Sequence, residues 1–120
     1  MSARLWLPPV LWAAFILMLT SIPGARIPHV SIEGIDKVVH LICYGVLALL
    51  AFPAVAARNG ARRAVVIVLL STALFGALDE WHQQFIPERS MDLLDWFADT
   101  LGGFLGLMAA LVLSRRTVRS

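Results

Sequence analysis

Hydrophobic residues fall into four long runs separated by short polar segments. The runs cover residues 5–22, 37–57, 64–86 and 93–113. Each has about the 20 residues that a helix needs to cross a hydrocarbon core of about 30 Å. Only helices can satisfy their own backbone hydrogen bonds in lipid from such runs. The pattern therefore predicts an all-α membrane protein, with residues 1–120 forming a single domain built as a bundle of four transmembrane helices.

The composition supports a membrane protein. Of the 120 residues, 59% are hydrophobic and only 15% are charged, whereas soluble domains carry about 25% charged residues. The formal net charge is +2, and the uneven distribution of basic residues between loops explains it better than an acidic partner, so no nucleic acid partner is expected. The single Cys43 lies in an apolar run, where it is predicted to be a small buried side chain.

The first run also resembles a secretory signal, with Arg4 before it and the small residues Gly24 and Ala25 after it. We expect this segment to be retained as a helix, because cleavage would leave three spans and remove the symmetry of the basic segments. Pro8 and Pro9 are predicted to lie in its first turn, where their missing N–H groups are not needed.

The distribution of charge predicts an orientation. Seven of the 10 basic residues lie on one side of the four runs, namely Arg4, Arg58, Arg62, Arg63, Arg115, Arg116 and Arg119. This side, with both termini, is predicted to be cytoplasmic in a multi-pass membrane protein. The acids and the histidines, including His29 and Glu33, fall toward the opposite side. We therefore expect any chemistry to face outward.

Acidic residues accumulate around the join between the third and fourth runs. The 15 residues from Ala64 to Leu78 give about 22 Å of helix, which is shorter than the hydrocarbon core. Asp79 and Glu80 are therefore predicted to lie within the outer half of the membrane. Ionisable groups at such a depth are costly and usually functional, so a functional role is favoured over a purely structural one.

Helical spacing brings further polar groups to the same depth. Asp36, His40 and Tyr44 follow one another by one turn, and Arg89 lies in the loop above. We predict one shared, partly buried pocket. The candidate catalytic residues are Glu80, Asp79, Asp95 and His40, and the candidate ligand-binding residues are Asp36, Tyr44, Gln83, Arg89 and Asp99.

Some of these residues also have a structural interpretation. Asp36, Lys37 and Asp92 can act as interfacial caps at helix starts, where acids also interact favourably with the helix dipole. The pair Gly102-xxx-Gly106 can support dimerisation, but it is predicted to serve packing within the chain.

Three kinds of chemistry remain open for the acidic cluster. Crowded carboxylates hinder one another's ionisation, which leaves one protonated and able to act as an acid. Together with His40 they can bind a divalent metal through oxygen and imidazole, although no His-x-x-x-His or Cys pair defines a zinc motif and no residue is assigned as a ligand. Arg89 can instead clamp a phosphate or carboxylate of a lipid-linked ligand, while the acids bind its amines or hydroxyls.

At these residues the chain resembles the VanZ-like family of small bacterial membrane proteins. The match covers nearly the whole chain in order, and the family pattern has Asn where this chain carries the extra carboxylate of Asp99. The resembling elements are Thr20-Ser21-Ile22-Pro23, Asp36-Lys37-x-x-His40-x-x-x-Tyr44, Asp79-Glu80-x-x-Gln83 with Pro87 and Arg89, and Asp95-x-x-x-Asp99-x-x-Gly102-x-x-x-Gly106.

The resemblance implies a four-helix membrane protein whose founding member is linked to low-level resistance to the glycopeptide antibiotic teicoplanin. It implies no defined reaction. The leading hypothesis is therefore action at the outer leaflet on cell-envelope chemistry or on a lipid-like antibiotic. The expected partners are the lipid bilayer and a lipid-linked or glycopeptide ligand.

Alternative functions stay open beside this hypothesis. A hydrolase or transferase for a lipid-linked substrate would use Glu80 or Asp95 as general base and His40 or Arg89 to stabilise an anion. Proton- or ion-coupled transport through the acidic cluster is another alternative, and it predicts a homo-oligomer because four spans are few for a monomeric carrier. A subunit whose polar face meets a partner protein would need no reaction at all.

Overall fold

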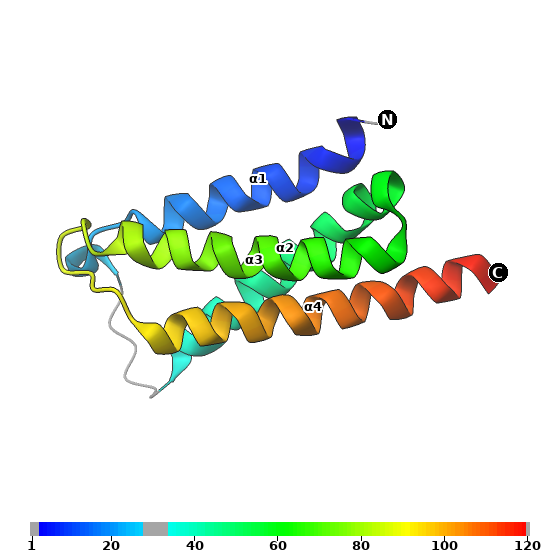
Figure 1. The fold of residues 1–120 in the computed structure, drawn as a ribbon. Coiled ribbons are helices and arrows are strands. Elements are labelled where there is room, and N and C mark those ends of the chain that lie inside the picture. The colour runs from blue at the N-terminus through cyan, green and yellow to red at the C-terminus, as the bar shows by residue number, and fades with distance from the viewer. Residues whose placement is uncertain (1–2, 28–33, 120) are drawn as a thin grey trace.

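The computed structural model describes residues 3–27 and 34–119 and has four long helices (Figure 1). Each is long and apolar enough to cross a membrane, which confirms the predicted all-α bundle of four transmembrane helices. His29 and Glu33 lie outside the described residues. The helices are α1 (Ala3–Thr20), α2 (Ile35–Asn59), α3 (Ala61–Gln83) and α4 (Leu93–Arg119), with a short 3₁₀ turn, η1 (Gly24–Arg26), after α1.

The helix ends differ from the predicted runs at several points. α1 begins at Ala3, so Pro8 and Pro9 lie in its second turn, and the prediction of a first-turn position is wrong. The third apolar run continues to residue 86, but α3 ends at Gln83 and two tight turns follow. α4 continues through the basic tail to Arg119, because no glycine or proline follows the fourth run to end it.

The two ends of the bundle have opposite character. Both termini lie at one end, on the right in Figure 1, together with the turn between α2 and α3. The end of α1, the start of α2 and the α3–α4 connection lie at the other end. The arginine-rich segments therefore gather at the end with the termini, and the acidic residues of α3 and α4 gather at the opposite end.

Glycines allow α2 and α4 to pack closely. A Cβ atom on Gly106 would collide with the carbonyl of Gly45, and one on Gly102 would collide with the carbonyl of Leu41. Small residues at a helix crossing let the backbones approach and increase van der Waals contact, which is a main source of association in membranes. The prediction that Gly102-xxx-Gly106 serves packing within the chain is confirmed.

The remaining packing separates an apolar half from a polar half. Phe52, Val55, Val68 and Leu107 belong to a buried core in the half nearer the termini. Large apolar side chains also cover much of the outer surface, as expected for helices surrounded by lipid. Cys43, predicted to be buried, is only partly buried. The polar groups are left to the other half of the bundle.

Candidate functional site

A lysine at the start of α2 binds the outer acids of the cluster. Lys37 Nζ donates to Asp36 Oδ2 and Asp92 Oδ2, both at 2.8 Å, and to Asp95 Oδ1 at 2.6 Å. The hydrogen bond from Lys37 holds the pKa of Asp92 below its usual range. Asp92 also accepts from the N–H of Leu94 at 2.9 Å and so caps α4, which confirms its predicted structural role.

Deeper in the bundle, His40 lies among three carboxylates from two other helices. Its Nδ1 is 2.7 Å from Asp99 Oδ1 and 3.8 Å from Glu80 Oε1, and its Nε2 is 3.6 Å from Asp95 Oδ2. Asp99 is fully buried, Glu80 is 2% exposed and Asp95 is 8% exposed. The structure thus confirms that α2, α3 and α4 bring these polar groups together.

Glu80 and Asp99, both buried beside His40, are held in different ways. Glu80 accepts from Gln83 Nε2 at 3.2 Å and from the N–H of Asp92 at 3.1 Å. Asp99 Oδ2 is buried and has no hydrogen-bond partner among the described residues. Its side chain packs against Gly76, where a Cβ atom would lie 3.0 Å from Oδ2. Of the two carboxylate oxygens of Asp99, only Oδ1 therefore has a polar partner in the part of the chain that the structure describes, namely His40 Nδ1.

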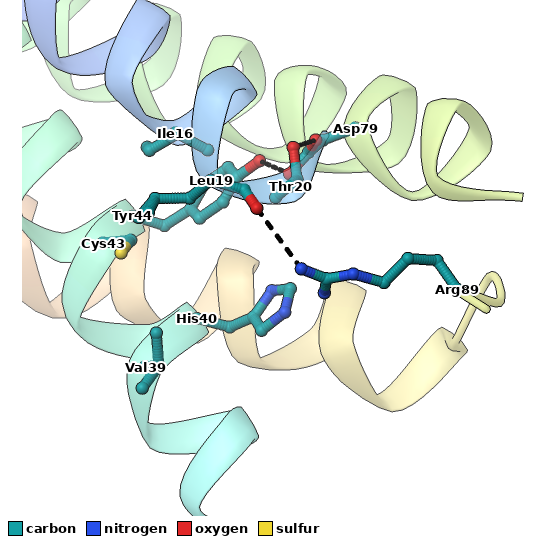
Figure 2. Close-up of a pocket in the computed structure, with 9 residues that line it drawn as sticks. All are labelled: Ile16, Leu19, Thr20, Val39, His40, Cys43, Tyr44, Asp79 and Arg89. Atoms are coloured by element: carbon teal, nitrogen blue, oxygen red, sulfur yellow. Dashed lines mark hydrogen bonds between the residues drawn. The ribbon is translucent and has the colours of Figure 1, made fainter. Parts of the chain in front are cut away.

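Asp79 forms a second polar group with two hydroxyls. Its Oδ1 accepts from Thr20 Oγ1 at 2.7 Å, and its Oδ2 accepts from the hydroxyl of Tyr44 at 3.0 Å. Figure 2 shows Asp79 meeting Thr20 at the end of α1, with Tyr44 beside them. These bonds link α1, α2 and α3, and both Asp79 and Tyr44 are buried.

Arg89, predicted to clamp an anionic ligand, binds the end of α1. Its Nε donates to the carbonyl of Ile22 at 3.1 Å. Its Nη2 donates to the carbonyl of Leu19 at 3.3 Å (Figure 2). The N–H of Gly24 donates to the carbonyl of Pro87 at 2.9 Å. The α3–α4 connection thus satisfies carbonyls that a helix end leaves free. The ligand-clamping role stays a prediction.

A cavity of about 90 Å³ lies between these groups. This space has room for a few water molecules or a small polar group. Its lining combines apolar side chains of α1 and α2 with polar side chains of α1, α2, α3 and the α3–α4 connection. It is lined by Ile16, Leu19, Thr20, Val39, His40, Cys43, Tyr44, Asp79 and Arg89.

The predicted site residues therefore occupy three positions. His40, Tyr44, Asp79 and Arg89 line the cavity. Three more are buried beside His40, namely Glu80, Asp95 and Asp99. Gln83 is buried as well and donates to Glu80. Asp36 lies at the outer rim, with 59% of its side chain exposed, and it is not among the residues that line the cavity.

A metal ion is one occupant that these side chains can hold. His40, Glu80 and Asp95 each offer one ligand atom, and the three atoms lie within 4.8 Å of one another. One imidazole and two carboxylates form a donor set that suits divalent transition metals.

Sequence reasoning missed two contributors to the site. The sequence predicts a capping role for Lys37, yet its side chain donates to three acids. Its position one turn before His40 is the signal that places it near the acidic cluster. Thr20 was not a candidate, although it belongs to the Thr20-Ser21-Ile22-Pro23 segment that carries part of the resemblance. Its hydroxyl reaches Asp79 across 59 positions of sequence.

Comparison with known families agrees with the architecture. The model of the VanZ/LLP1 family matches residues 5–114. The chain belongs to the VanZ/LLP1 family. No curated protein and no solved structure shows a significant match. Because the family match runs through all four membrane-spanning helices, the chain is a multi-pass VanZ/LLP1 membrane protein with a polar site at one end of its bundle.

Proposed function

We propose that this VanZ/LLP1 protein acts at the outer leaflet of the bacterial inner membrane on an amphiphilic cell-envelope ligand or on a lipid-like antibiotic of the teicoplanin type. The cavity carries this proposal, because both apolar and polar side chains line it. Val39, one of the apolar side chains, is 48% exposed. A ligand can therefore insert a polar group toward His40 and Asp79 while its apolar part stays in lipid.

The size of the cavity narrows the ligand class. At about 90 Å³ it accepts only a small polar group, such as a hydroxyl, an amine or a single acid group. A glycopeptide would thus be held by one group and by its acyl chain, not enclosed. Asp79 can accept from an amine or hydroxyl in place of Thr20 or Tyr44, and Arg89 borders the same space.

Action at the outer leaflet depends on the orientation of the bundle. The arginine-rich end is the end with both termini, and the positive-inside tendency favours a cytoplasmic position for it. A fluorescent protein fused after Ser120 should fluoresce, whereas alkaline phosphatase at the same position should be inactive. The same two reporters inserted between Phe85 and Ile86 should give the opposite result. A periplasmic C-terminus would overturn the outward-facing site.

The function is tested by teicoplanin susceptibility of a sensitive Gram-positive host that expresses the chain. We expect wild type to raise tolerance, and both Glu80→Gln and Tyr44→Phe to remove the increase at equal membrane abundance. Tyr44→Phe deletes only the hydroxyl that donates to Asp79. Glu88→Gln, an acid in the exposed connection, is the matched control and should behave as wild type. No tolerance from well-inserted wild type would overturn the antibiotic form of the proposal.

A hydrolase or transferase is the second candidate, and the contact between His40 and Asp99 favours it. A carboxylate at Nδ1 orients an imidazole so that Nε2 can accept a proton from water or a hydroxyl as it attacks a substrate. His40 also lines the cavity. This candidate predicts that cell lipids from the expressing strain contain a product that His40→Gln abolishes and Glu88→Gln retains. Ion-coupled transport would instead make function depend on a proton or ion gradient.

A further inference from the structure

We propose that His40, Glu80 and Asp95 bind a divalent first-row transition metal ion. Their three ligand atoms lie within 4.8 Å of one another. Ligand atoms about 2.0–2.2 Å from a metal cannot be further apart than twice that distance, so only small side-chain adjustments are needed. The proposal goes beyond the ligand proposed above and does not depend on it, because it concerns binding by the protein alone.

Neighbouring groups hold the side chains of His40 and Asp95 in place beside each other. Asp99 Oδ1 lies 2.7 Å from His40 Nδ1, which leaves Nε2 as the free ligand atom, and metal-binding histidines commonly have such a carboxylate behind them. Lys37 holds Asp95 through Oδ1. Asp95 Oδ2 then faces His40 Nε2 at 3.6 Å, too far for a hydrogen bond. At this separation, an ion that lies to one side of the pair can bind both atoms at about 2.0–2.2 Å.

The balance of buried charge points independently to a cation. Asp79, Glu80, Asp95 and Asp99 are each at most 8% exposed, and Lys37 contacts only one of them. Asp99 Oδ2 is buried with no hydrogen-bond partner among the described residues. Burying a carboxylate without a compensating charge is costly. An ion beside His40 would compensate this charge where Lys37 does not reach.

The donor set decides the class of ion. Calcium takes six to eight oxygen ligands and magnesium keeps several waters, whereas an imidazole nitrogen suits zinc, iron, cobalt or nickel. Lys37 is the cation that contacts one of the proposed ligands, through Asp95 Oδ1. Its charge lowers the affinity for a metal ion but leaves Asp95 Oδ2 available. We therefore expect a transition metal held by three protein ligands, with solvent completing its coordination.

The test uses the full chain, purified in mild detergent, stripped with a chelator and titrated with Zn²⁺ by calorimetry and with Co²⁺ by visible absorption. We expect one ion per chain and the absorption bands of cobalt bound to nitrogen and oxygen. His40→Ala, Glu80→Gln and Asp95→Asn should each abolish the bands or weaken binding strongly. Asp99→Asn should weaken binding about 10- to 100-fold, as for other residues behind a metal-binding histidine. Glu88→Gln should bind as wild type.

Two results would overturn the proposal. One is the absence of binding by wild type that remains helical and monodisperse, which would mean that protons neutralise the buried acids. The other is binding that survives both Glu80→Gln and Asp95→Asn, which preserve shape and so should fold. The outcome is separate from that of the susceptibility assay. Metal binding without any change in antibiotic tolerance would overturn only the antibiotic form of the proposed function.

Discussion

His40 on α2 and Asp99 on α4 are joined at 2.7 Å between Nδ1 and Oδ1, with Asp99 fully buried and the His40 side chain 13% exposed. This contact lies on the same helix seam as the crossing of Gly45 and Gly106, where the two backbones approach most closely because neither residue has a side chain. The glycines therefore do more than pack the helices. They bring α2 and α4 near enough for a short carboxylate to reach the imidazole.

Replacing Asp99 should separate the role of its shape from that of its acceptor oxygen. Asp99→Leu leaves His40 Nδ1 buried without its partner, and we expect a loss of about 1–3 kcal/mol in the free energy of unfolding. Asp99→Asn retains an acceptor of the same size and should stay closer to wild type. Unfolding in a denaturing detergent, followed by circular dichroism, measures both. Equal stability of Asp99→Leu and wild type would contradict the structural importance of the contact.

Lys37 should be coupled more strongly to Asp95 than to Asp36. The side chain of Asp95 is 11% exposed and that of Asp36 is 59% exposed, and solvent screens the exposed pair. Double-mutant cycles with Lys37→Met should give about 1–3 kcal/mol of coupling to Asp95→Asn and about 0–1 kcal/mol to Asp36→Asn. Unfolding of the four variants measures this. Equal coupling energies would show that the more buried Lys37–Asp95 pair does not stabilise the fold more than the exposed Lys37–Asp36 pair.

Enlarging Gly106 should weaken the bundle. In Gly106→Val the new side chain meets the backbone of Gly45, which cannot move aside as a flexible side chain can, so we expect a loss of about 1–3 kcal/mol or more. Ala109→Val places the same side chain on an exposed part of α4 and should be nearly neutral. Thermal unfolding in detergent compares them. Similar melting of the two variants would show that α2 and α4 do not cross at Gly106.

Arg89 should control the order of the end of α1. Arg89→Gln cannot make both bonds to the carbonyls of Leu19 and Ile22, so amide hydrogen exchange over residues 19–24 should become faster while that of α4 is unchanged. Arg89→Lys should only partly restore protection, because lysine lacks the planar fork of donors. Arg26→Gln, an exposed arginine in the same region, is the control. Unchanged exchange in Arg89→Gln would show that these bonds carry little stability.

The sequence by itself determined the class of fold and the location of the polar site. Run length predicts the four helices, because crossing a hydrocarbon core requires a fixed length of apolar helix. The position of Asp79 and Glu80 within their run predicts their depth, and helical spacing predicts that Asp95, Asp99, Gly102 and Gly106 share one face. These features follow from the geometry of single helices, so they can be derived without knowing how the helices pack.

Only the tertiary structure decided which of these groups meet. Spacing along one helix does not fix its rotation or its axial offset against the next. The sequence therefore could not separate the group around His40 from the pair of hydroxyls on Asp79, nor give the size of the cavity between them. Lys37 and Arg89 have long side chains that reach several partners, and their contacts with acids and with the end of α1 depend on helix placement. Partner choice in this bundle is a property of packing between helices.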